Sequence, residues 1–435
     1  MSAVQVRLAE PGDNDQLIAL TLACPMQGDI GLCMDRSPNF FALSALEGDR
    51  FRVGVALNDK GQIVGSIAVA VREVWLNEKP TTIVYASDMK VHPDYRDRKH
   101  ADALQRWGAE RAVEMCGRNV SILSTVLGGN AAMEARYRGP RGLHQQTKIA
   151  TTRAHTIFLL WKRSPPKVPG IAVRPAEERD LDAMGELWSA IGGKRQFAFT
   201  YGADAIRSWL KRAPSLSIAD YWVAYDQDGR LVGFCGFWDQ EPLKHMRVTR
   251  YSSSLRRVRT LFNLAAPLFG ATKLPAEGDT LRYVTAVNVC VPGSRPDVFR
   301  AIVLAAYGEL RKKPYSFMTI GLDVKDPLAG GLDGLLAQPT DIRVTKHQWG
   351  AFYGTDLDVQ LRRRGIKTLV LGGIATNFGV ESTAEQAWER GYAVVVAEDA
   401  TSSVSAEMHA FSIGSMLPRL SRIVKAGEIH LARAD

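Results

Sequence analysis

The sequence predicts a mixed α/β protein with two similar α+β domains in tandem, followed by part of a doubly wound parallel α/β sheet. Passages that start at Val4 and at Ile171 share the pattern V-R-x-A, an acidic stretch and a helical pattern, which indicates an internal duplication. Each copy also has two β-branched or aromatic runs joined by a polar turn with glycine, a hairpin signal. After Thr340 strand and helix patterns alternate strictly, which is typical of a parallel sheet.

The two copies are expected to occupy most of the chain. Their hairpins are predicted at Val53–Val71 and Tyr221–Trp238, and Lys162–Gly170, with three prolines, is the predicted linker. The third segment follows the second copy directly. The predicted domains are residues 1–163, 171–340 and 341–435.

Length and composition indicate a globular protein with several domains. The chain has 435 residues, of which 46% are hydrophobic and 23% charged, and this length predicts two to four domains. No run of about eighteen apolar residues is present to span a bilayer. The N-terminus lacks the basic and then apolar pattern of a secretory signal, so a cytoplasmic location without a membrane partner is expected.

Charge and cysteine content narrow the classes of ligand. The formal net charge of +9 favours an anionic ligand such as a nucleotide-bearing cofactor. Arginine clusters occur without a nucleic-acid recognition motif, so no nucleic-acid partner is expected. The five cysteines form no C-x-x-C pair, which argues against a disulfide framework and predicts no metal site.

The passage Ile83–Val113 of the first copy carries the predicted cofactor site. A strand ending near His92 leads into a basic loop, Arg96–Lys99, and then into a helix that is expected to begin at about Ala101. Free backbone N–H groups and positive charge would therefore meet at one helix start. That arrangement suits a pyrophosphate.

The same residues resemble the signature of the GNAT superfamily of N-acetyltransferases. Val91, Pro93 and Arg96-x-x-Lys99-x-Ala101 follow its strand, V-x-P-x-x-R-like turn and R/Q-x-x-G-x-G/A helix start. The resemblance implies GNAT folds in tandem and acetyl-CoA as the cofactor. Lys99 stands where the family usually has glycine, and we expect it to crowd the loop while its charge compensates in part. The cofactor-binding residues that the resemblance implies are Met89, Val91, Arg96, Arg98, Lys99, His100, Ala101 and Asn130.

The resemblance also implies direct acyl transfer to an amine. Tyr137 follows Asn130 by seven residues, and in the family this spacing places a phenol where it protonates the departing thiolate. Asp88 is the predicted base, with Glu73 and His92 acting through water as alternatives. A half-buried packing role is the alternative for Tyr137. The acceptor is expected to be a small-molecule or peptide amine that the sequence does not specify.

The second copy is predicted to be a degenerate GNAT-like domain. Its corresponding passage, Leu281–Leu310, keeps a long strand and a helix, but the turn between them reads V-P-G-S-R-P-D-V-F. A structural or substrate-shaping role is therefore favoured over a catalytic one. Tyr307 is expected to be a core residue, and the copy is expected to lack its final strands.

The third segment is predicted to alternate strand and helix, with glycine just beyond each helix. The expected strands and helices, in order, are Asp341–His347, Thr355–Gly365, Lys367–Ile374, Val380–Gly391 and Tyr392–Ala400.

Residues Thr345–Ser403 resemble the isochorismatase-like cysteine hydrolases. Lys346 matches the catalytic lysine, and Gly372–Ala384 supplies the landmarks of the motif G-I-x-T-x-x-C-V-x-x-T-A. Gly379 stands where the family has its nucleophilic cysteine, and the strand that bears the catalytic aspartate has no counterpart. Lys346 and Gly379 are therefore expected to form a vestigial hydrolase site, because the acyl-enzyme route needs a thiolate. The resemblance also allows a cis peptide bond at Ile374–Ala375.

Three functions remain open from the sequence. The leading prediction is an acetyl-CoA-dependent N-acyltransferase with its chemistry in the first copy. The alternatives are a hydrolase that activates water without the cysteine, and a non-catalytic ligand-sensing or scaffold protein. Half of a parallel sheet leaves an inner strand exposed, so a homo-oligomer that forms through the third segment is also predicted.

Overall fold

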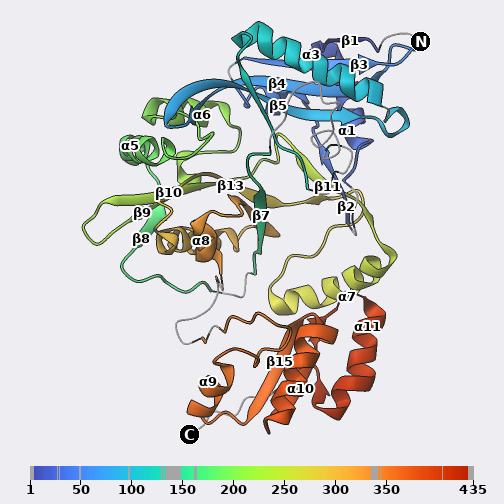
Figure 1. The fold of residues 1–435 in the computed structure, drawn as a ribbon, viewed down its shortest axis with the longest axis vertical. Coiled ribbons are helices and arrows are strands. Elements are labelled where there is room, and N and C mark those ends of the chain that lie inside the picture. Colours follow the sequence, from blue (N-terminus) through green and yellow to red (C-terminus); the bar gives the residue numbers. More distant parts are fainter. Residues whose placement is uncertain are drawn as a thin grey trace. The chain divides into compact units, whose positions relative to one another are not determined.

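The computed structural model falls into two compact units, Met1–Leu336 and Ala337–Asp435, which we describe separately (Figure 1). No helix in the portion described is long and apolar enough to cross a membrane. The residues described are 4–26, 28, 30–48, 50–96, 98–128, 130, 133, 148–160, 164–333, 335, 341, 342, 344–403 and 405–429.

The first sheet of the larger unit has the order β1-β3-β4-β5-β6. Its neighbouring strands are antiparallel except for the pair β5 and β6, which is parallel. The predicted hairpin of the first copy is confirmed as β3 and β4. The strands are β1 (Val6–Leu8), β3 (Phe51–Leu57), β4 (Ile63–Leu76), β5 (Lys79–Val91) and β6 (Ser121–Ser124), and the helices are α1 (Asn14–Leu22), α2 (Phe41–Ser44) and α3 (Arg98–Cys116).

Helix α3 lies along one face of this sheet (Figure 1). Its buried Leu104 and Trp107 pack on the strands. A Cβ at Gly54 of β3 would lie only 2.5 Å from the Trp107 ring, so glycine lets the helix approach closely. The helix begins at Arg98 rather than at about Ala101. The exposed Lys99 therefore lies in the first helical turn, where a lysine is sterically tolerated, and not in a loop that it would crowd.

The second sheet has the order β7-β14-β13-β10-β9-β8, and its last five strands repeat the pairing pattern of the first sheet. The hairpin of β9 and β10 confirms the second predicted hairpin. The strands are β7 (Thr152–Phe158), β8 (Ala172–Pro175), β9 (Tyr221–Tyr225), β10 (Leu231–Trp238), β13 (Tyr283–Cys290) and β14 (Phe317–Asp323), and the helices are α5 (Leu181–Gly192), α6 (Ala203–Arg212), α7 (Ser253–Phe269) and α8 (Pro296–Leu310).

Strand β7 corrects the expectation that the second copy lacks its final strands. It lies within the predicted first domain, yet it pairs antiparallel with β14 from Thr152↔Asp323 to Phe158↔Phe317. Strand β14 is itself present beside β13. The second sheet is therefore completed by a strand that precedes the predicted linker, and Tyr307 of α8 is fully buried in its core, as expected.

A third sheet joins the two copies within the larger unit. Strand β11 (His245–Tyr251) pairs with β12 (Thr280–Leu281) and with β2 (Ile30–Asp35), so one strand of the first copy is bound to two of the second. A bridge between Val74 and Phe199 adds a further contact. The two copies are interlocked by backbone hydrogen bonds.

Matching details support the predicted duplication. Arg7 donates two hydrogen bonds of 2.7 and 2.8 Å to the carboxylate of Asp13, and Arg174 makes two of the same lengths to Asp180. Both carboxylates also accept a backbone N–H from three residues earlier. Each copy thus opens with a strand fastened to the turn that starts its first helix.

Both copies also carry a β-bulge at the same place. Asp88 and Met89 of β5 oppose the single residue Ile67 of β4, and Asn288 and Val289 of β13 oppose one residue of β10. Asp88 and Asn288 have φ angles of 49° and 50°, in the left-handed region, which asparagine and aspartate tolerate better than most residues. The bulge re-aims the end of each long strand.

The smaller unit contains a parallel three-stranded sheet of order β15-β16-β17. The expectation of a parallel α/β sheet is confirmed, and Gly365 and Gly391, with φ angles of 64° and 82°, end two of its helices. The expected strand at Asp341–His347 is wrong, because its described residues form no strand. The elements are α9 (Leu357–Arg363), β15 (Thr368–Ile374), α10 (Glu381–Glu389), β16 (Ala393–Ser402), α11 (Ala406–Phe411) and β17 (Arg422–Val424).

Candidate functional site

Strand β5 extends beyond its parallel partner. Its pairing with β6 runs from Ile83↔Ser121 to Ala86↔Ser124, whereas β5 itself continues to Val91. We call residues Ser87–Val91 the open segment. Among the described strands, only β4 pairs with it. Such an edge offers backbone N–H and C=O groups to an extended ligand.

The carbonyl oxygens of the open segment differ in their contacts. Val91 O accepts from Arg96 Nε at 3.3 Å and from Cys24 Sγ at 3.5 Å. Among the described residues, no side chain donates a hydrogen bond to Met89 O. Met89 O thus differs from Val91 O, against which the Arg96 side chain lies.

The second copy diverges at the corresponding place, but a side chain fills the gap. Pairing of β13 with β14 ends at Thr285↔Thr319. The guanidinium of Arg195 then donates to Val289 O at 3.0 Å and to Val291 O at 3.1 Å. The backbone acceptors that would face a ligand are therefore already bound.

The open segment leads directly to the start of α3. A single 3₁₀ turn, Pro93–Tyr95, separates them, and the first four N–H groups of a helix have no partner within the helix. Lys99 is exposed here, and the His100 ring lies 5.7 Å from that of Tyr95. Ala101 is buried beneath this turn. The side chain of Arg98 lies outside the described part of the structure.

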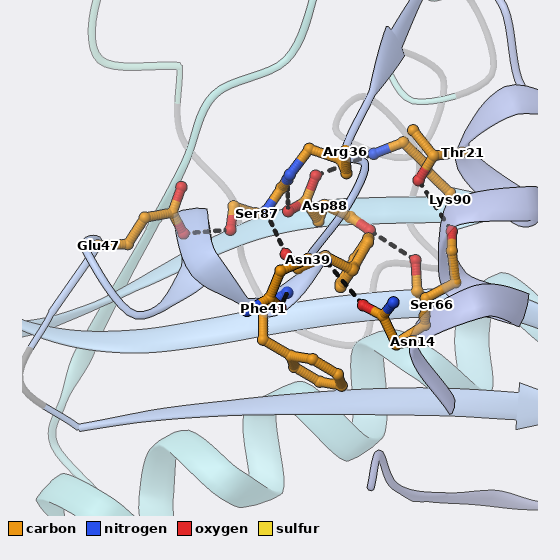
Figure 2. Close-up of polar contacts among 12 residues, drawn as sticks. Asn14, Thr21, Arg36, Asn39, Phe41, Glu47, Ser66, Ser87, Asp88 and Lys90 are labelled. Atoms are coloured by element: carbon orange, nitrogen blue, oxygen red, sulfur yellow. Dashed lines mark hydrogen bonds and ion pairs between the residues drawn. The ribbon is translucent and has the colours of Figure 1, made fainter. Parts of the chain in front are cut away.

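The predicted base Asp88 lies in a buried ion-pair cluster (Figure 2). Arg36 Nη1 is 2.5 Å from its Oδ2 and Lys90 Nζ is 2.9 Å from its Oδ1. Burial alone would raise the pKa of the carboxyl, but the two cations lower it to about 2. A carboxylate held in this way is a weak proton acceptor, so the geometry does not favour Asp88 as the base.

Glu47, which was not singled out in the sequence, lies beside the same strand. Figure 2 shows its carboxylate reaching Ser87, and Ser87 Oγ donates to Glu47 Oε2 at 2.5 Å. Arg72 Nε donates to the Glu47 backbone oxygen at 2.6 Å. Burial raises the pKa of the Glu47 carboxyl, and the hydrogen bond from Ser87 opposes that rise only in part. No local pattern could reveal this contact, because Ser87 is distant in sequence.

Lys244 brings a cation from the second copy to this cluster. Burial and the nearby Arg36 lower the pKa of its ammonium group, while Asp88 and Glu47 act in the opposite direction. Its ammonium group makes no hydrogen bond or ion pair with a described residue. Two carboxylates of the first copy and a half-buried lysine of the second thus influence one another electrostatically.

The remaining predicted residues are more exposed or undescribed. Glu73 is exposed and accepts from Thr82 Oγ1 at 2.5 Å, and the His92 side chain, 34% exposed, lies 3.7 Å from the Asp94 carboxylate. Asn130 Oδ1 accepts the backbone N–H of Met133 at 3.2 Å. Tyr137 lies outside the described residues, so its role stays a prediction from the sequence.

In the smaller unit, Lys346 and Gly379 lie together as the motif predicts. A Cβ built at Gly379 would be 2.9 Å from Lys346 Nζ, which itself donates to Trp349 O at 2.7 Å. The Ile374–Ala375 peptide bond is cis, as the resemblance implies. The lysine is thus placed beside a position that holds no nucleophile.

No group of three or more His, Cys, Asp or Glu side chains in the described ranges could hold a metal ion. His409 Nδ1 instead lies 2.8 Å from Thr376 Oγ1. The cluster that contains Asp88 and Glu47 is held by ion pairs and hydrogen bonds between described side chains.

Comparison with known proteins identifies the C-terminal part. The isochorismatase domain family matches residues 323–428, so this part of the chain is an isochorismatase-like domain. The uncharacterized isochorismatase family protein YecD of Escherichia coli O157:H7 is 59% identical over 93 residues, which are 21% of this chain and 50% of that protein. YwoC of Bacillus subtilis (strain 168), from the same family, is 55% identical over 85 residues, 20% of this chain and 45% of that protein. The chain spans about half the length of these curated relatives.

The larger part of the chain has a structural counterpart. The crystal structure of Saccharomyces cerevisiae N-myristoyltransferase with bound myristoyl-CoA aligns over 78% of this chain and 81% of that one, with a TM-score of 0.51 and 14% sequence identity. A similarity at this level of identity shows the fold alone. It confirms the predicted class, a mixed α/β protein.

Proposed function

We propose that the chain is an acyl-CoA-dependent N-acyltransferase whose cofactor binds in the first copy. The open segment Ser87–Val91 carries this proposal, because it ends in a turn that leads to the first turn of α3. The pantetheine part of the cofactor would lie along the open segment and its pyrophosphate at the first turn of α3. The fold is shared with a protein that was solved with an acyl-CoA bound.

The second copy is proposed to shape the site rather than to bind a second cofactor. Arg195 already binds the carbonyl oxygens of Val289 and Val291. The second copy also contributes Lys244 to the cluster near Asp88. Both observations favour one cofactor per chain.

The proposed reaction is direct transfer of the acyl group to an amine. The amine nitrogen attacks the thioester carbonyl carbon, the C–S bond breaks, and coenzyme A leaves as a thiolate that takes up a proton. Tyr137 is the proposed donor of that proton. Acetyl-CoA is the proposed donor of the acyl group, and a small-molecule or peptide amine is the proposed acceptor.

The isochorismatase-like part is proposed to be inactive as a hydrolase. Lys346 lies beside Gly379, which has no side chain to form an acyl-enzyme. We propose that this part instead supports self-association through β15, which pairs only with β16 among the described strands.

Calorimetric titration with acetyl-CoA, and in parallel with myristoyl-CoA, tests the cofactor site. We expect micromolar binding of at least one of them to the intact chain, and a loss of at least tenfold in affinity in Arg96→Glu, because the reversed charge repels the phosphates. Arg179→Glu, at a position 71% exposed in the second copy, is the matched control and should bind like the original chain. Absence of binding by the original chain would overturn the proposal.

A further inference from the structure

We propose that Glu47 accepts the proton of the attacking amine. This inference rests on the proposed acyltransferase function and adds the residue that makes the amine nucleophilic. Asp88, on the same strand as the cofactor, then holds the bulge in place and takes no part in proton transfer.

Glu47 lies beside the point where β5 and β6 stop pairing. Its partner Ser87 is the first residue of the open segment, directly after Ala86, where pairing with β6 ends. One carboxylate oxygen, Oε2, is fixed by the Ser87 hydroxyl. The other, Oε1, makes no hydrogen bond with any described residue. Glu47 thus has an anchored side chain and an oxygen available at the point where the strands diverge.

The surroundings of Glu47 make its carboxylate a stronger proton acceptor than an ordinary glutamate. Burial raises its pKa, and Ser87, Arg72 and Arg36 counter this rise while Asp88 adds to it. Lys244 of the second copy is close enough for Asp88 and Glu47 to raise its pKa, against the lowering by burial and Arg36. Asp88, by contrast, has a pKa lowered to about 2 by its two cations. Two neighbouring carboxyl groups whose environments shift their pKa values in opposite directions are typical of a division between a base and a fixed anion.

The proton and electrons balance without any further reagent. The Glu47 carboxylate takes one proton from the protonated amine, and the neutral nitrogen then bonds to the thioester carbon. The C–S bond breaks, and its electron pair stays on sulfur as the coenzyme A thiolate. Glu47 then returns its proton to solvent, and the second proton that the nitrogen loses is balanced by the proton that the thiolate takes up. The products are an amide and coenzyme A with a free thiol.

Two acceptor probes separate this role from a structural one. Methylamine is protonated at pH 7 and needs a base, whereas hydroxylamine is already neutral. With acetyl-CoA as the donor and release of the coenzyme A thiol as the readout, we expect Glu47→Gln to lower the rate with methylamine by about 100-fold or more. The rate with hydroxylamine and the affinity for acetyl-CoA should change less than about threefold.

Matched variants complete the test. Glu186→Gln makes the same change at an exposed position of α5 and should leave both rates unaltered. Ser87→Ala removes a hydrogen bond that lowers the pKa of Glu47, so the acid limb of the rate profile with methylamine should move to higher pH. Glu47→Asp retains a carboxylate and should restore part of the rate with methylamine.

The results distinguish failure of the proposed role of Glu47 from failure of the proposed acyltransferase function. The role of Glu47 would be overturned if Glu47→Gln lost the same rate with both probes or kept its rate with methylamine. It would also be overturned if the original chain reacted with hydroxylamine but not with methylamine. In each case the acyltransferase function would stand. If the original chain neither binds acetyl-CoA nor releases coenzyme A with either probe, the proposed function fails and this inference fails with it.

Discussion

Asp88 and Glu47 show how surroundings decide what a carboxylate can do. Asp88 is fixed between Arg36 and Lys90, whereas Glu47 has one anchored and one available oxygen. In the second copy the same bulge carries Asn288, whose Oδ1 accepts from the Tyr221 hydroxyl at 2.7 Å. The bulge therefore occurs with either side chain, and in both copies that side chain is fixed by polar contacts.

The site beside Lys346 leads to a prediction at the same scale. In Gly379→Cys the new side chain would lie next to the lysine ammonium, since a Cβ there is 2.9 Å from Nζ. A nearby cation favours the thiolate, so the thiol pKa should fall below its ordinary range. We expect alkylation by iodoacetamide at pH 7 to be at least tenfold faster than that of the same thiol without its lysine partner.

The double variant Gly379→Cys with Lys346→Met is the control, and the original chain gives the background from its five natural cysteines. Equal alkylation rates in the single and double variants would show that Lys346 does not act on this position.

At the scale of elements, β5 and β13 are equivalent strands with different neighbours. Both carry the bulge and both outrun their parallel partner. In β13 the guanidinium of Arg195 donates to both Val289 O and Val291 O. In β5 the guanidinium of Arg96 donates to Val91 O, and no described side chain donates to Met89 O. One duplicated element can therefore bind a ligand in one copy and a side chain in the other.

Strand β15 is the element that leads to an assembly prediction. Among the described strands it pairs only with β16, and it contains no charged residue or proline to guard its free edge. Val370 and Ile374 are 45% and 83% exposed, although parallel strands are usually covered on both faces. We expect the intact chain to self-associate at micromolar concentration through this edge, and Val370→Lys to shift it to monomer, as measured by size-exclusion chromatography with light scattering.

Val359→Lys is the matched control, because Val359 is 49% exposed but lies on helix α9. It should leave the oligomeric state unchanged. A monomeric original chain, or the same effect from both variants, would contradict an interface at β15.

At the scale of the whole molecule, the sequence predicts features that depend on neighbouring residues, but it does not reveal pairing between distant segments. Both hairpins and the glycines that end helices have signatures within a few residues of sequence. Strand β7 had none, because the strand with which it pairs, β14, comes more than a hundred residues later. The strand expected at Asp341–His347 shows the reverse error, since a β-branched run near a turn is not sufficient to form a sheet pair.

The residues of the candidate site likewise differ in whether local sequence could indicate them. Met89, Val91 and Arg96 could be placed from the sequence because a strand, a turn and a helix follow one another there. Glu47 and Lys244 could not, because burial and contacts between the two copies bring them to the site and set the pKa of each. A sequence without its fold gives no measure of burial.

Hydrogen exchange of the intact chain, measured with and without acetyl-CoA, tests whether the first copy alone binds the cofactor. We expect slower amide exchange in Ser87–Val91 and in the first turn of α3, and no change in Ala286–Cys290, where Arg195 already donates to the backbone. Equal protection in both copies, or protection in the second copy alone, would contradict it.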